Sequence, residues 1–147
     1  MALLTSADQQ RLRDAFSEMT RPVRLLFFTQ SFACETCPMT RQILDELPPL
    51  SDKITIDEIN LVLDGDKAKQ YGVDRAPAVA VLWRDEQGMD RDTRIRFLGA
   101  PSGYEFMSLV QAVLLAGGRP SGLSSESRAR LAAVDKPVTI QVFTTPT

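Results

Sequence analysis

Residues 23–28 read Val-Arg-Leu-Leu-Phe-Phe, and residues 34–38 read Cys-Glu-Thr-Cys-Pro. The first run is apolar, rich in aromatic residues and bounded by turn-forming residues, which is typical of a strand buried on both faces. Apolar residues then recur at helical spacing from position 39 to 47, until a proline pair at 48–49 ends the pattern. The two cysteines are therefore predicted to lie where a buried strand passes into a helix.

The elements around this stretch alternate between helices and strands. Before it, Ser6 and Gln9 match a capping box that predicts an amphipathic helix, which Pro22 ends. After it, the pattern predicts a strand at 53–62, a short polar helix at 64–71, a strand at 78–83, a hairpin tip at 87–88, a strand at 93–98 and a helix at 106–114 whose apolar stripe belongs to the core. Because crossovers make parallel neighbours and hairpins make antiparallel ones, we predict an α/β fold with a central mixed four-stranded sheet flanked by helices. This order, with the cysteines after the first strand, is that of the thioredoxin fold.

The composition excludes several classes of function. The net charge is −2 and the 17 basic residues are scattered, so neither nucleic acid nor an anionic membrane is expected as a partner. The sequence contains no histidine, which removes the commonest general base and most zinc and haem sites, and no cofactor is expected. No run is long enough for a transmembrane helix, and the first residues do not resemble a signal peptide. We therefore expect a cytoplasmic protein whose partners are proteins or small thiols.

The two cysteines, Cys34 and Cys37, are too few and too close together for a disulfide framework. Three interpretations remain: a redox-active pair, half of a zinc site, and an inert buried pair. A zinc site would have to be shared between two chains, because the sequence has no histidine to complete it. The position of the pair between a strand and a helix, followed by Pro38, favours thiol/disulfide chemistry.

That chemistry gives each cysteine its own catalytic role. Unpaired backbone amides and the dipole at a helix start favour the thiolate of Cys34, which we expect to be the nucleophile. Cys37 is expected to be more covered and to resolve the mixed disulfide. Glu35, between them, opposes thiolate formation by its negative charge, so we expect a moderately reducing pair.

A second copy of the first elements begins near the end of the chain. A shift of 115 residues aligns Pro22 with Pro137 and Phe28 with Phe143, together with the residues around them. We therefore expect a thioredoxin-fold unit at 1–119, a linker at 120–126 where Ser, Gly and Pro predominate, and the helix and first strand of a truncated second unit at 127–147. An apolar strand at 138–143 without its own domain would seek a sheet edge, so we expect dimerisation through it or poor order.

Three further segments complete a family resemblance. They are Val73-Asp74-Arg75-Ala76-Pro77-Ala78, Phe97-Leu98-Gly99-Ala100-Pro101 with Gly103-Tyr104-Glu105-Phe106, and Val142-Phe143-Thr144-Thr145-Pro146-Thr147. With the cysteine pair, they make the chain resemble the protein disulfide oxidoreductases, glutaredoxin-like proteins with two thioredoxin-fold units in tandem. Residues 94–120 also resemble the N-terminal domain of the flavoprotein alkyl hydroperoxide reductases, whose first unit lacks the cysteines present here. This chain departs from the family by having Tyr104 at a usual histidine position and by lacking a second cysteine pair.

The resemblance implies a disulfide oxidoreductase of cell redox homeostasis that acts on protein disulfides and exchanges electrons with a thioredoxin reductase-like flavoprotein and a peroxiredoxin. It implies a cis Pro77 opposite the cysteines. A cis bond there would expose the backbone of Ala76 for pairing with an extended substrate peptide, and we expect Arg75 to help select acidic partners. Phe28 occupies the place of the buried carboxylate of the thioredoxin pattern, and alternation along a strand expected at the centre of the sheet makes Glu58 the candidate replacement. For Glu58 and Arg75 the alternative is a solvated charge or a structural ion pair. The alternative is a non-enzymatic docking or scaffold domain of a peroxide-reductase electron-transfer system.

Overall fold

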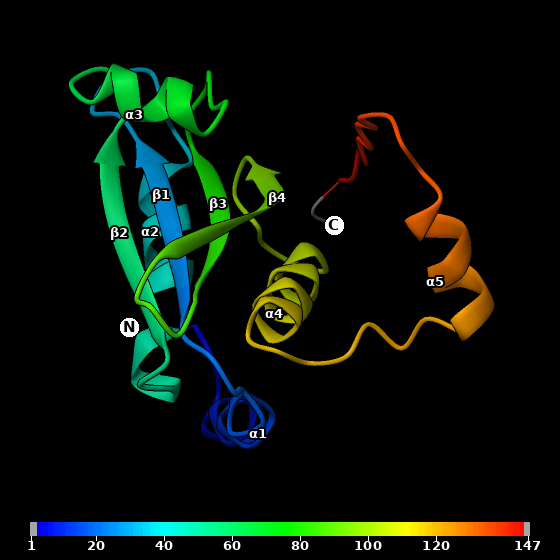
Figure 1. Cartoon of the computed structure of the whole chain (residues 1–147). Coiled ribbons are helices and arrows are strands. Elements are labelled where there is room, and N and C mark those ends of the chain that lie inside the picture. Colours follow the sequence, from blue (N-terminus) through cyan, green and yellow to red (C-terminus); the bar gives the residue numbers. More distant parts are fainter. Residues whose placement is uncertain (1–2, 146–147) are drawn as a thin grey trace.

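The computed structural model describes residues 3–145, and its strands form one sheet (Figure 1). In chain order the elements are α1 (Ser6–Phe16), β1 (Val23–Thr29), α2 (Cys37–Asp45), the 3₁₀ turn η1 (Pro48–Leu50), β2 (Ile54–Asn60), α3 (Gly65–Gln70), β3 (Ala78–Arg84), β4 (Asp90–Leu98), α4 (Glu105–Ala116) and α5 (Ser125–Ala132). This order and the mixed sheet confirm the predicted α/β class and the thioredoxin fold. Two residues of the predicted C-terminal motif, Pro146 and Thr147, lie outside the described residues. Within those residues, no helix is both long and apolar enough to cross a membrane.

The strands lie in the order β2-β1-β3-β4. β2 runs parallel to β1, whereas β3 runs antiparallel to β1 and β4 runs antiparallel to β3. Phe28, near the end of β1, is level with Ile59 near the end of β2 and with Ala78 at the start of β3. Ala78 is in turn level with Leu98 at the end of β4. The loops that follow β1, β2 and β4 and the loop that precedes β3 therefore lie together at one end of the strands, which we call the loop edge of the sheet.

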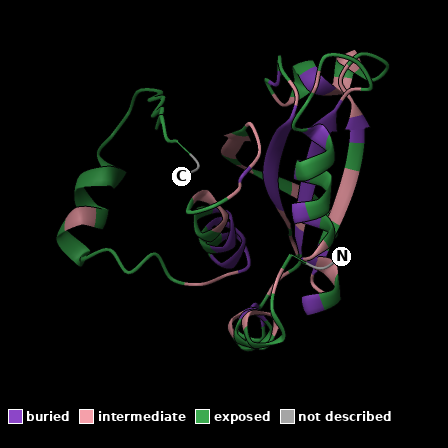
Figure 2. Cartoon of the chain, turned by 180° about the vertical axis from the view of Figure 1, so that it is seen from behind, coloured by how far each residue is buried: buried purple, intermediate pink, exposed green. Residues whose placement is uncertain are grey.

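The side chains of β1 alternate between two apolar layers. Leu25 and Phe27 belong to the larger buried cluster, with side chains of α1, α2 and α4, and Leu26 and Phe28 belong to the smaller one, with side chains of α3. These four side chains are at most 1% exposed, and burial of each contributes about 1.5–3 kcal/mol. Figure 2 shows the same buried centre along the sheet and α4, and the apolar stripe of α4 is core as predicted.

Several predicted element ends differ from the structure by one to three residues, and two of them have a clear local cause. α1 is capped by Thr5 rather than by Ser6, because Thr5 has extended backbone angles and its Oγ1 accepts the N–H of Asp8 at 3.2 Å. β2 ends at Asn60, two residues before the predicted end. There, Oδ1 of Asn60 accepts the N–H of Val62 at 3.0 Å and turns the chain away from the sheet.

The C-terminal end of α4 is fastened to the segment between α1 and β1. Thr20 donates its N–H to the carbonyl of Gly117 at 2.8 Å, and Nε of Arg21 donates to the carbonyl of Ala116 at 2.7 Å. Gly118 follows with a φ of +107°, and a Cβ there would overlap Oγ1 of Thr20. Only glycine fits this close approach, so Gly118 allows the chain to turn directly after α4.

Residues 120–145 are largely exposed and lie apart from the sheet (Figures 1 and 2). α5 begins after its N-cap Ser124 and buries none of its residues. Residues 138–143 form no strand in the described chain, and Phe143 is 90% exposed. The strand expected there is absent because its backbone groups need a neighbouring edge, and none of the described strands pairs with them. The division into 1–119, 120–126 and 127–147 stays a prediction.

Candidate active site

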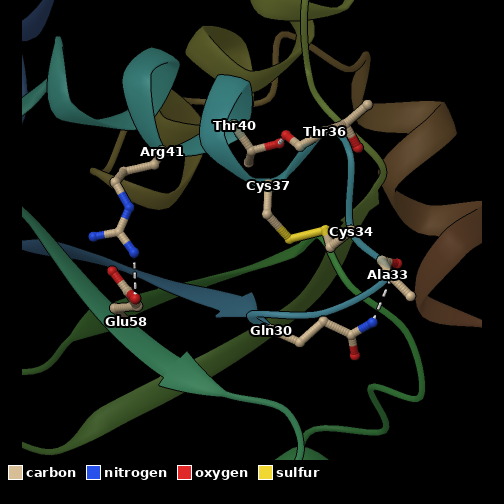
Figure 3. The surroundings of a disulfide bond; sticks show 8 residues. All are labelled: Gln30, Ala33, Cys34, Thr36, Cys37, Thr40, Arg41 and Glu58. Carbon is tan, nitrogen blue, oxygen red and sulfur yellow. Dashed lines mark hydrogen bonds and ion pairs between the residues drawn. A yellow bond between two sulfur atoms is a disulfide. The ribbon is translucent and has the colours of Figure 1, made fainter.

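Cys34 and Cys37 form a disulfide with their Cα atoms 5.4 Å apart (Figure 3). Cys37 is the first residue of α2 and is 5% exposed, while Cys34 lies in the preceding turn and is only partly buried. The helix thus begins three residues after Cys34 rather than at it, because Thr36 is the N-cap and Pro38 suits a first helical turn. The order of burial is as predicted, so a partner reaches Cys34 more readily than Cys37.

Side-chain hydrogen bonds hold both sides of the cysteine turn (Figure 3). Gln30 donates Nε2 to the carbonyl of Ala33 at 3.3 Å, and Thr40 donates Oγ1 to the carbonyl of Thr36 at 2.9 Å. Ala33 has a φ of +53°, in the left-handed region that residues other than glycine rarely adopt. The backbone immediately before Cys34 is therefore held in an uncommon conformation by its neighbours.

Glu58 forms an ion pair with Arg41 across the space between β2 and α2 (Figure 3). It is level with Phe27 in the sheet and lies on the side that α2 covers. The prediction that Glu58 lies on a central strand is wrong, because β2 is an edge strand. Its side chain is 41% exposed, and its role beside the cysteines stays a prediction. Arg41 is not among the site residues predicted from the sequence, although it follows Cys37 by four residues and so shares its face of α2.

The loop before β3 lies at the loop edge of the sheet, as does the cysteine turn. The Ala76–Pro77 peptide bond is cis, as the resemblance implies, and Pro77 is buried. The carbonyl of Pro77 accepts the N–H of Gly99 at 2.9 Å, which ties this loop to the end of β4. Ala76 and Cys34 both pack against the larger core cluster. The fold therefore gathers the two cysteines, Ala76 and Pro77 at the loop edge.

Arg75 is engaged with its neighbour Asp74. Its Nε donates to Oδ1 of Asp74 at 2.8 Å, and both side chains are exposed. The hydrogen bond from Arg75 lowers the pKa of the Asp74 carboxyl, and the same contact raises the pKa of Arg75. Because the two charges largely cancel for an approaching protein, the structure adds no support to the selection of acidic partners by Arg75.

The arrangement is suited to thiol/disulfide exchange rather than to metal binding. Within residues 3–145, no group of three or more Cys, His, Asp or Glu side chains is placed to hold a metal ion. The disulfide offers one accessible sulfur and one covered sulfur in a turn that the surrounding hydrogen bonds define. A thiolate can attack the accessible sulfur of this disulfide and release Cys37 as a thiolate; in the reduced pair, the Cys34 thiolate can attack a substrate disulfide, and Cys37 can then resolve the mixed disulfide.

Comparison with known proteins places this geometry among redox proteins. No family model matches the chain. A protein described as a probable thioredoxin from Methanothermobacter thermautotrophicus is 34% identical over 89 residues, which are 60% of this chain and 92% of that protein. An alkyl hydroperoxide reductase protein of Xanthomonas campestris pv. phaseoli is 32% identical over 111 residues, which are 74% of this chain but only 17% of the reductase.

Solved structures show the same fold. The N-terminal domain of the alkylhydroperoxide reductase AhpF from Enterococcus faecalis superposes with a TM-score of 0.79 and 30% identity, covering 90% of this chain and 62% of that chain. A protein disulfide oxidoreductase from Aeropyrum pernix gives a TM-score of 0.73 at 24% identity, covering 88% and 54% of the two chains, and supports the fold alone. This chain thus spans somewhat over half of either structure.

Proposed function

Because the chain belongs to the thioredoxin family, we propose that it reduces or exchanges protein disulfides through Cys34 and Cys37. The observation that carries this proposal is the pair itself, a disulfide after a buried strand in which one sulfur is more accessible than the other. The match to 92% of a probable thioredoxin supports it.

The reaction proceeds in two exchange steps. The thiolate of Cys34 attacks one sulfur of the substrate disulfide, so that a mixed disulfide forms and the other substrate sulfur leaves as a thiolate that takes up a proton. Cys37 then loses its proton and attacks the Cys34 sulfur, which releases the second substrate sulfur. The substrate gains two electrons, and the protein returns to the disulfide form of the structure. A dithiol or a thioredoxin reductase-like flavoprotein must supply two electrons to restore the dithiol.

The ion pair of Arg41 and Glu58 tunes the second step. Arg41 lies one helical turn after Cys37 on the same face of α2, and a nearby cation favours a thiolate over a thiol. Glu58 holds the guanidinium against the β2 side of the helix. Glu58 is therefore a positioning residue that acts through Arg41, rather than a buried proton acceptor, while Glu35 opposes the Cys34 thiolate from within the turn.

The substrate peptide is proposed to bind beside the cysteines along the backbone of Ala76 and Pro77. These two residues and Cys34 border the loop edge of the sheet, and Gly99 fixes the loop that carries them. An extended peptide that pairs with the Ala76 backbone would bring its own cysteine to Cys34. Arg75 stands next to this backbone, but its contact with Asp74 leaves it a minor contribution to recognition.

A second candidate function is a docking domain in a peroxide-reductase system. The similarity to AhpF over 90% of this chain favours it, and on this reading the partners are a flavoprotein and a peroxiredoxin. The cysteine pair and the docking role are compatible, because a redox-active unit can also deliver electrons within such a system. Cysteine-dependent turnover separates an active unit from a passive one.

The first experiment is dithiothreitol-driven reduction of insulin disulfides. We expect the wild type to accelerate the reaction, Cys34→Ser to abolish the acceleration, and Cys37→Ser to accumulate a mixed disulfide that non-reducing electrophoresis detects. Ser31→Ala, an exposed change in the same loop, is the matched control and should retain wild-type activity. A wild type no faster than dithiothreitol alone would leave the docking domain as the better explanation.

A further inference from the structure

A groove of about 670 Å³ opens beside the cysteine turn, between α2 and the loop that precedes α4. One wall comes from the cysteine turn and α2, the other from the loop between β4 and α4, and the N-terminal residues close one end. Its lining includes Glu35, Pro38, Met39, Glu46, Pro101 and Phe106. Its size lies within the usual range of binding pockets, about 300–1,000 Å³.

The groove combines apolar walls with negative charge. Met39, Pro101 and Phe106 provide apolar surface, and Met39 is about half exposed. Among the described residues that line it, the only charged side chains are Glu35 and Glu46. Oε1 of Glu46 accepts the N–H of Leu3 at 2.8 Å, but this contact does not neutralise the carboxylate. The groove therefore presents two negative charges and no lining cation.

The groove also lies next to the cysteine pair, because the residue between the cysteines and the residue after Cys37 both line it. Glu35 lies between the two cysteines, and Pro38 follows the second of them directly. Glu46 follows Glu35 by eleven residues, and the two are roughly 16 Å apart if each residue advances 1.5 Å along the helix. A peptide joined to Cys34 in a mixed disulfide can thus lay four or five residues along the groove, at about 3.3 Å per extended residue.

We propose that this groove binds the segment of a substrate protein that flanks its disulfide, and that it selects segments in which an apolar side chain is accompanied by lysine or arginine. The apolar side chain lies against Met39 and Phe106, and the cation lies near Glu35 or Glu46. This inference rests on the proposed oxidoreductase function and names its substrate class. Acidic segments are disfavoured because the two carboxylates repel them. This repulsion discriminates basic from acidic segments without any additional contact.

The test uses disulfide-linked peptides that differ only beside the cysteine. One carries leucine and lysine, the second leucine and glutamate, and the third serine and lysine. Reduced full-length protein is mixed with each peptide, and the rate constant is divided by that of the same protein with the small neutral compound hydroxyethyl disulfide. This ratio removes changes in thiol reactivity and leaves recognition of the flanking residues.

We expect the leucine–lysine peptide to react about tenfold faster than the leucine–glutamate peptide at low salt, and the advantage to shrink with added salt. The serine–lysine peptide should fall between them, because it lacks the apolar contact. Glu46→Gln keeps the acceptor for the Leu3 N–H but removes the charge, and should lower the lysine preference about threefold. Glu126→Gln, an exposed change on α5, is the matched control and should leave the preference unchanged.

Two outcomes would overturn the inference, and they are distinguishable. If all three peptides react equally while hydroxyethyl disulfide and insulin are still reduced, the groove does not select substrates and the oxidoreductase function stands. If the lysine preference is present but survives Glu46→Gln and Glu35→Gln alike, another surface provides it. Failure to reduce any disulfide, by contrast, counts against the proposed function itself.

Discussion

The chain contains the same pattern twice, and the two copies reach different structures. In the first copy, the helix α1 and Pro22 lead into β1, where Phe28 is fully buried. In the second, α5 and Pro137 lead into residues 138–143, where Phe143 is 90% exposed. The helices form in both copies, because each has a hydroxyl N-cap and local hydrogen bonds suffice. The strand forms only where neighbouring strands pair with it. Strand formation therefore depends on tertiary partners, whereas the start of the helix does not.

The aligned residues Phe28 and Phe143 should differ most in how far substitution by alanine lowers the free energy of unfolding. Phe28→Ala should lower the free energy of unfolding by about 3–5 kcal/mol, because it leaves a cavity between the sheet and α3. Phe143→Ala should change it by less than about 0.5 kcal/mol, as for an ordinary surface substitution. Urea unfolding followed by circular dichroism measures both. A cost above about 1 kcal/mol for Phe143→Ala would show that residues 138–143 pack against something in solution, a second chain included.

Two glycines, one on each side of the boundary at residue 119, should differ next most in the stability that substitution by alanine costs. Gly118 and Gly122 both have positive φ, but a Cβ on Gly118 would overlap Thr20, whereas a Cβ on Gly122 would meet no atom within 4 Å. Gly118→Ala should therefore destabilise the protein by about 2–3 kcal/mol, from backbone strain and overpacking together. Gly122→Ala should cost about 0.5 kcal/mol or less, because a linker can change its angles without loss of packing.

The same urea titrations test the pair of glycine variants. Thr20→Ala in the Gly118→Ala background should recover part of the loss, since it removes the atom that the new Cβ meets. Equal costs at the two glycines would mean that the segment after residue 119 is held as firmly as the unit before it, and would remove the proposed boundary.

Features fixed by neighbouring residues could be predicted from the sequence. The buried strand at 23–28, the cysteine turn and the apolar stripe of α4 are set by local composition and spacing, and each lies within a few residues of its predicted place. The mixed sheet follows from the order of crossovers and hairpins. The redox pair is predictable because two cysteines in the absence of histidine leave few other uses.

Features that depend on the spatial order of the strands could not be predicted. The pattern predicts Glu58 on a central strand, but β2 lies at the sheet edge, and chain order alone does not reveal that. Its partner Arg41 comes from another element, so the ion pair depends on how α2 lies over β2. The groove beside the cysteines likewise needs the loop after β4 to face α2. The residue pattern at 138–143 predicts a strand, but that pattern carries no information on whether an edge is available.

Removal of residues 120–147 should have the smallest effect of all. Arg119, which pairs with Glu18, is retained, and α5 takes no buried residue with it. We expect the midpoint of thermal unfolding to move by less than about 2 °C. The urea m value is the sharper measure, because it scales with the surface that becomes exposed on unfolding. A segment already exposed in the native state adds little to that surface, so the m value should stay the same. A clear fall in m on truncation would mean that the segment is buried in solution, and the two copies of the pattern would then differ less than the structure shows.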